Sequence, residues 1–194
     1  MGSGKESAGS LFTSDRERRL WAWTAAVVVA IYSTLGLART LAGILREEGL
    51  LVAAFGLGML LVGGTVLVVG LRRRPGGLEI GIALGVATAY YMVLVRMALP
   101  EERTHLIEYG VVAVLFHEAL KERASGNRRV PVPALIAVVA AAAVGAIDEV
   151  IQAFLPTRVF DLEDILFNSL AAVMAVASSV ALSWARRWRL GRSR

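Results

Sequence analysis

Apolar residues run in long blocks along the chain, and short polar stretches separate the blocks. Six blocks approach the roughly 20 residues that a helix needs to cross a bilayer. They are Leu20–Leu37, Leu50–Leu71, Leu78–Leu99, Glu102–Leu120, Pro133–Leu155 and Asp164–Trp184. The fourth block is the weakest, because histidines and glutamates interrupt it. The pattern predicts an all-α, polytopic membrane helix bundle with six transmembrane helices.

The composition agrees with this prediction. Hydrophobic residues make up 56% of the 194 residues, charged residues make up 19%, and cysteine is absent. An average soluble domain has fewer apolar and more charged residues, so these values argue against a soluble, disordered or disulfide-stabilised chain. The short connections leave one transmembrane domain over residues 20–185. We expect a flexible tail at 1–19 and a basic tail at 186–194.

The charges along the chain predict the orientation, since cytoplasmic loops collect Lys and Arg. With six spans, both termini and the second and fourth connections fall on the same side. That side holds sixteen of the 21 Lys and Arg residues. We therefore expect both termini in the cytoplasm of a bacterial plasma membrane. The net charge of +5 then reflects orientation and does not point to nucleic acid.

The acidic residues are distributed the other way, with ten of the 16 Asp and Glu residues on the outer side. Acids contribute little to membrane orientation, so this surplus needs another reason. Ionisable residues inside a membrane protein are costly and usually functional. The outer side is therefore where we expect the function to reside.

Three polar segments supply the outer acids at helical spacing. His105, Tyr109 and Glu108 lie in the fourth span, and Glu108 sits well below the membrane surface. The other two segments end the fifth span and open the sixth; their polar members are Asp148, Glu149, Gln152, Asp164 and Asn168. We expect the three segments to form a carboxylate-rich cavity that is open to the outside.

A purely structural interpretation remains open at this stage. Arg96, Arg103 and Arg158 could pair with the carboxylates and tie the helix ends together. The acids outnumber these cations, which favours a cavity. With two histidines and no cysteine, a zinc site is not expected, and the sequence indicates no cofactor. A Mg²⁺ or Ca²⁺ ion held by carboxylates stays an alternative that no motif calls for.

Small residues at four-residue spacing predict where the helices pack, because lipid tails give no hydrophobic drive for association. Such stripes occur in the third, fifth and sixth spans; they are Gly77–Gly81–Gly85–Ala89, Ala137–Ala141–Gly145 and Ala171–Ala175–Ser179. We expect these three helices to approach one another closely. The four tryptophans lie at span ends on the inner side, as interfacial anchors do.

The polar segments also carry a family resemblance. The stretches ERTHLIEYG (102–110) and DEVIQAFLPTRVFDLEDILFN (148–168) resemble the VanZ-like family over roughly residues 80–185. The matching positions are His105, Tyr109, Asp148, Glu149, Gln152, Pro156, Arg158, Asp164 and Asn168. One departure is the sequence after Asn168, where the family often has a glycine and this chain has Ser169 and alanines.

The resemblance implies a role at the cell envelope and an association with resistance to teicoplanin, a lipoglycopeptide that acts on the outer face. Two hypotheses about function follow, and both involve membrane lipids or lipid-linked envelope precursors as partners.

In the first hypothesis the protein is a hydrolase or transferase with glycosidase-like acid–base chemistry. Glu149 and Asp164 are the expected working pair, and the other catalytic candidates are Asp148, Glu108 and His105. The expected substrate-binding residues are Arg158, Gln152, Asn168, Tyr109 and Arg96. In the second hypothesis the same cavity binds a lipid, a lipoglycopeptide or a cation, or serves transport, without catalysis.

Overall fold

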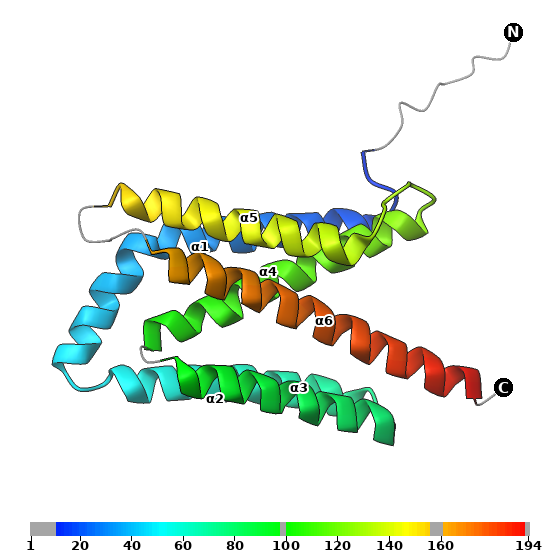
Figure 1. The fold of residues 1–194 in the computed structure, drawn as a ribbon, viewed down its shortest axis with the longest axis horizontal. Helices are drawn as coiled ribbons and strands as arrows, with labels where there is room; N and C mark the ends of the chain where they lie inside the picture. The colour runs from blue at the N-terminus through cyan, green and yellow to red at the C-terminus, as the bar shows by residue number, and fades with distance from the viewer. Residues whose placement is uncertain (1–10, 98–99, 156–160, 193–194) are drawn as a thin grey trace, which may run out of the picture.

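The computed structural model describes residues 11–97, 100–155 and 161–192. Figure 1 shows these residues as a bundle of long helices. The elements are α1 (Asp15–Glu47), α2 (Leu51–Arg72), α3 (Gly77–Arg96), α4 (Pro100–Ser125), α5 (Pro133–Ala153) and α6 (Leu162–Arg192). The all-helical prediction is confirmed for the described residues. Both α1 and α6 extend into the regions where the sequence predicts tails.

Five of these helices are long and apolar enough to cross a membrane; they are α1 over Asp15–Leu37, α2, α3, α5 and α6. The exception is α4, which is the weak fourth span of the sequence. Its low hydropathy has a structural reason: α4 packs against α1, α5 and α6, and Leu106, Tyr109 and Val112 on it are fully buried. A helix surrounded by protein can carry polar groups that a lipid-facing helix cannot.

The opposite case is α2, in which no residue is buried. Its surface is almost entirely aliphatic, with leucines such as Leu57, Leu60 and Leu61 exposed. A helix that is apolar all round and contacts little protein suits a lipid environment. The two helices show that hydropathy here reports contact with lipid rather than the presence of a helix.

The helix boundaries follow recognisable sequence signals. The Ser14 side chain accepts a hydrogen bond from the backbone N–H of Glu17 and caps α1. Pro133 occupies the first turn of α5, which ends at Ala153, three residues before Pro156. Asp161 accepts a hydrogen bond of 2.8 Å from the backbone N–H of Glu163 and so caps α6.

The connections gather at two ends of the bundle. Figure 1 shows the start of α1, the α2–α3 and α4–α5 connections and the end of α6 at one end, here called the basic end. Ion pairs tie this end together: Arg16 pairs with Glu122 at 2.8 Å, and Arg189 pairs with Glu79 at 3.0 Å. The ends of α1, α3 and α5 lie at the opposite end, here called the acid-rich end. Five of the six helices have the length and hydropathy of a membrane span, so the sixth span and the cytoplasmic location of both termini stay predictions of the sequence.

The orientation can be tested with single cysteines, because the chain has none of its own. Ser125→Cys places a thiol at the basic end, and Leu50→Cys places one at the acid-rich end; both positions are exposed. On intact bacterial cells, a membrane-impermeant maleimide should label only the Leu50→Cys protein. Labelling of Ser125→Cys before the cells are permeabilised would contradict a cytoplasmic basic end.

Glu17 is a buried residue of α1 that connects this helix to α4 at the basic end. Its fully buried carboxylate accepts hydrogen bonds from the Thr13 backbone N–H at 2.6 Å and the Thr13 hydroxyl at 2.7 Å. It also accepts one from Arg123 of α4 at 3.2 Å. Glu17→Ala should lower the free energy of unfolding by about 1–3 kcal/mol, because several partly buried donors lose their buried acceptor. Asp15→Asn, at an exposed position two residues earlier, should change it little in the same thermal unfolding experiment.

The small-residue stripes behave differently on different helices. Ala137, Ala141 and Gly145 of α5 are buried, as are Ala171 and Ala175 of α6, and these helices pack together. The stripe on α3 is instead exposed, and added methyl groups at its three glycines, Gly77, Gly81 and Gly85, would meet nothing within 4 Å. The predicted close approach is therefore confirmed for α5 and α6 and wrong for the α3 stripe. The contact between α3 and α6 is made at other positions, including Glu79 and Arg189.

Candidate functional site

Six polar side chains from three helices are buried together toward the acid-rich end. We refer to them as the acid-end cluster: His105, Tyr109, Asp148, Glu149, Gln152 and Asn168. His105 is 6% exposed, and the other five are between 0% and 1% exposed. All six are residues that the sequence predicts for the site. The structure therefore brings the core of the predicted set together.

Two adjacent carboxylates on α5 are both fully buried, although successive helix positions point about 100° apart. Asp148 interacts electrostatically with Tyr109 of α4 and Tyr32 of α1. Glu149 interacts with Asp164 of α6. α5 lies against α1, α4 and α6, so protein covers both directions and neither carboxylate reaches the surface.

Each of the two carboxylates has one oxygen with a partner. The Gln152 side-chain amide donates to Asp148 Oδ2 at 2.9 Å, one helical turn along α5. The backbone N–H of Asp161 donates to Glu149 Oε2 at 3.2 Å, just before α6 begins. The second contact fixes the start of α6 relative to the end of α5.

His105 and Asn168 connect α4 to α6. His105 Nδ1 lies 3.1 Å from Asn168 Oδ1, so the imidazole donates this hydrogen bond in the present amide orientation. The ring also stacks on Tyr109, one turn further along α4, with 6.0 Å between centroids and 14° between planes. These contacts hold the imidazole in one position beside the carboxylates, and Glu149 interacts with it electrostatically.

Four polar atoms of the cluster have no hydrogen-bond partner among the residues that the structure describes. They are the Tyr109 hydroxyl, Asp148 Oδ1, Glu149 Oε1 and Asn168 Nδ2. Two are acceptors, one is a donor, and the hydroxyl can serve as either. Leaving such groups unsatisfied costs about 1–3 kcal/mol each, so stability does not explain their presence. Native structures contain few such atoms, and a catalytic or ligand-binding role is one reason for them.

The predicted cations do not pair with these carboxylates in the described part of the chain. Arg103 donates to the Met97 carbonyl at 2.8 and 3.2 Å, and its guanidinium lies 5.7 Å from the Phe55 ring centroid. Arg96 is exposed at the end of α3, and no contact among the described residues joins it to the cluster. Arg158 lies outside the described residues, as does Pro156. The interpretation of the acids as simple ion-pair ties therefore finds no support at Asp148 and Glu149.

The site is more closed than the sequence suggests. We expected a cavity open to the outside, yet the acid-end cluster is almost entirely shielded. Asp164 and Glu108 lie at its margin and are partly exposed; each interacts electrostatically with a cluster residue. Among the described residues, no group of three or more His, Asp or Glu side chains could hold a metal ion, so the hard-cation alternative gains no support.

Two contributors to the site are not evident from the sequence. Tyr32 of α1 donates to the Val144 carbonyl of α5 at 2.8 Å and thereby approaches Asp148. A single tyrosine in an apolar span gives no signal of this role. Gly145 lets Asn168 approach the α5 backbone: an added Cβ would lie 2.7 Å from Asn168 Cβ. The small-residue stripe on α5 predicted that Gly145 is a packing position. It did not show that Gly145 packs against Asn168, a residue of the site.

The chain was compared with protein families, curated proteins and solved structures. A family model described as VanZ/LLP1 matches residues 80–183, which is more than half of the chain and includes every residue of the acid-end cluster. No curated protein and no solved structure matches the chain. The chain, a helical protein with several candidate membrane spans, therefore belongs to the VanZ/LLP1 family.

Proposed function

We propose that this protein is a multi-pass enzyme of the bacterial plasma membrane that hydrolyses or transfers a group on a lipid-linked sugar or lipid headgroup. The observation that carries the proposal is the pair of buried carboxylates, Asp148 and Glu149. Among the residues that the structure describes, each has one oxygen without a hydrogen-bond partner, and neither forms an ion pair with Lys or Arg. Carboxyl groups in different environments can divide the roles of acid and base. Glu149 is fully buried, whereas Asp164, which interacts with it electrostatically, is partly exposed. The extracytoplasmic face of the bundle, which we assign to the acid-rich end, is where the substrate would be met.

The roles follow from position. Glu149 and Asp164 interact electrostatically across the α5–α6 contact, so one can act as general acid and the other as general base. His105, held by Asn168 and Tyr109, is a second proton carrier within the same cluster. The unpartnered Tyr109 hydroxyl and Asn168 amide supply donors for a substrate oxygen.

The closed state of the cluster limits how a substrate arrives. Because Asp148 and Glu149 are fully buried, a headgroup must enter from the margin, where Asp164 and Glu108 are partly exposed. Entry from the membrane interface would keep the lipid tails among the helices and the reacting bond near the carboxylates. Closed sites that exclude water strengthen electrostatic interactions in the transition state.

The same burial favours a second function, in which the cluster binds a headgroup or lipoglycopeptide, or relays protons, without covalent chemistry. Incubation of the purified protein with extracted envelope lipids, followed by mass spectrometry, separates the two functions. The enzyme proposal predicts the loss of one lipid species and the appearance of a product. A lipid that is retained unchanged would support the binding function instead.

A further inference from the structure

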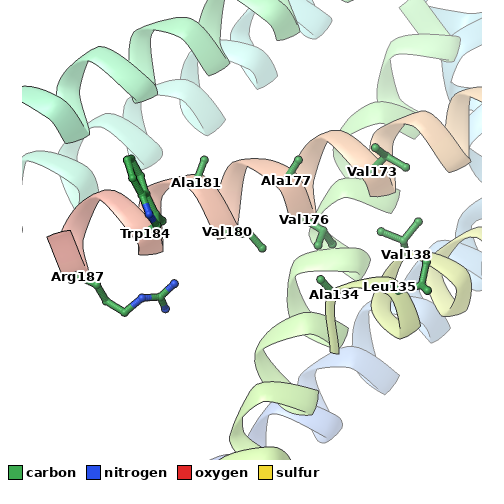
Figure 2. Close-up of a pocket in the computed structure, with 10 residues that line it drawn as sticks. All are labelled: Ala134, Leu135, Val138, Val173, Val176, Ala177, Val180, Ala181, Trp184 and Arg187. Carbon is green, nitrogen blue, oxygen red and sulfur yellow. The ribbon is translucent and has the colours of Figure 1, made fainter. Parts of the chain in front are cut away.

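A long apolar groove lies between α5 and α6 toward the basic end, away from the acid-end cluster. Its volume is about 580 Å³, within the roughly 300–1,000 Å³ of ligand pockets. Figure 2 shows its lining along α6 and the first turns of α5. Apart from Trp184 and Arg187, every side chain that lines it is aliphatic. The groove forms where α6 diverges from α5 (Figure 1).

The groove has the length of a lipid chain. Its α6 wall runs from Val173 to Arg187, which is about 21 Å at the α-helical rise per residue. One leaflet of a bilayer contributes about half of the roughly 30 Å hydrocarbon core. The groove therefore reaches from headgroup level past the depth of one leaflet. The small side chains of Ala177 and Ala181, which line the groove, leave room for a ligand along this length.

The cation at the end of the groove is available for a ligand. Arg186 and Arg189, its neighbours on α6, pair with the buried Glu79 at 3.5 and 3.0 Å. Arg192 lies over an indole ring at 3.9 Å. Arg187 is exposed and, among the residues that the structure describes, has no ion pair. Figure 2 shows its guanidinium beside the open end of the groove.

We propose that this groove holds one acyl chain of an anionic phospholipid, with the phosphate bound by Arg187. Aliphatic walls suit the chain, and a guanidinium binds phosphate oxygens through paired hydrogen bonds. Trp184, between them, belongs to the residue type preferred at the membrane interface. Basic residues on the cytoplasmic side also attract anionic lipids. This site is independent of the function proposed for the acid-rich end.

A second copy of the chain is the alternative occupant. A partner helix could cover the aliphatic walls, yet it would also have to bring a carboxylate to Arg187. A phospholipid supplies both an apolar chain for the aliphatic walls and a negative charge for Arg187 in one molecule. The positive charge of Arg187 at the groove end therefore favours a phospholipid over a second copy.

Native mass spectrometry of the full-length protein, titrated with phosphatidylglycerol or phosphatidylcholine, tests the proposal. The wild type should retain phosphatidylglycerol in preference to phosphatidylcholine. Arg187→Gln should weaken phosphatidylglycerol binding about five-fold and leave phosphatidylcholine unaffected. Ala177→Trp should reduce the binding of both lipids by filling the groove, and Ala181→Leu provides a milder filling variant. Arg72→Gln, which removes an exposed charge elsewhere at the basic end, should match the wild type.

Two results would overturn the proposal. If Arg187→Gln and Arg72→Gln bind phosphatidylglycerol equally, Arg187 holds no phosphate. If the wild type appears as a lipid-free dimer that Ala177→Trp or Ala181→Leu dissociates, the groove is an interface between copies. A thermal unfolding curve for each variant shows that the comparison is made on folded protein.

Discussion

The Glu149→Gln protein should lose turnover of its envelope lipid by at least 10²-fold, within the 10²–10⁴-fold range of general acid–base catalysis. Glutamine has the size of glutamate and can still accept the Asp161 backbone hydrogen bond that Glu149 accepts at 3.2 Å. The variant should therefore fold and insert normally while losing the ability to exchange a proton. Asp164→Asn should show a loss of the same order, because Asp164 interacts with Glu149 across the site. Lipid mass spectrometry on the purified variants measures both effects.

Glu163→Gln is the matched control for these two variants. Glu163 neighbours Asp164 on α6 but is exposed, so removing its charge should leave turnover within about two-fold of the wild type. Full activity in both Glu149→Gln and Asp164→Asn would refute acid–base catalysis by this pair. A loss in all three variants would mean that the net charge of the acid-rich end matters more than any one proton.

Gly145→Ala should lower the free energy of unfolding by about 1–3 kcal/mol, as overpacking of a close contact does. The added Cβ would lie 2.7 Å from Asn168 Cβ and 3.0 Å from Asn168 Nδ2. Asn168 Cβ is attached to the α6 backbone and cannot rotate away, so α5 and α6 must separate. The separation should also disturb the His105–Asn168 contact, so activity should fall together with stability.

Gly110→Ala is the control for this substitution. Gly110 is also a buried helical glycine that faces α6, but its added Cβ would meet Ala175 Cβ at an ordinary 3.6 Å. Both variants gain the same helix propensity, so the difference between them isolates the clash. Thermal unfolding should place Gly110→Ala at or above the wild type. A Gly145→Ala protein that unfolds at the same temperature as Gly110→Ala would show that the α5–α6 contact is looser than the structure indicates.

The helices that could be predicted from the sequence are those whose surfaces contact lipid, because lipid contact requires an apolar composition. α2, α3, α5 and α6 face lipid over much of their length, and their apolar blocks are plain. The central helix α4 was the weak prediction, because burial in protein removes the need for an apolar surface. The same logic explains the error at α3: a small-residue stripe predicts close packing, but nothing in the spacing identifies the partner, and this stripe remains exposed.

The residues that form the site could be predicted from the sequence, but their burial could not. The clustering of His105, Asp148 and Asn168 could be predicted, because each lies near a helix end and these three helix ends meet at the acid-rich end. Spacing alone could not show that α1 covers Asp148 through Tyr32. It also could not show that Arg103 donates to the Met97 carbonyl. These contacts depend on how whole helices are placed, which no local pattern encodes.

The proposed enzyme function requires the acid-end cluster to carry out covalent chemistry on an envelope lipid. The most direct measurement is the mass spectrum of extracted envelope lipids after incubation in ¹⁸O-labelled water with the wild type or Glu149→Gln. We expect a product that only the wild type forms. It should contain ¹⁸O if water accepts the transferred group, and no ¹⁸O if another lipid accepts it. Lipids recovered unchanged from the wild type, although one of them binds to it, would contradict the claim.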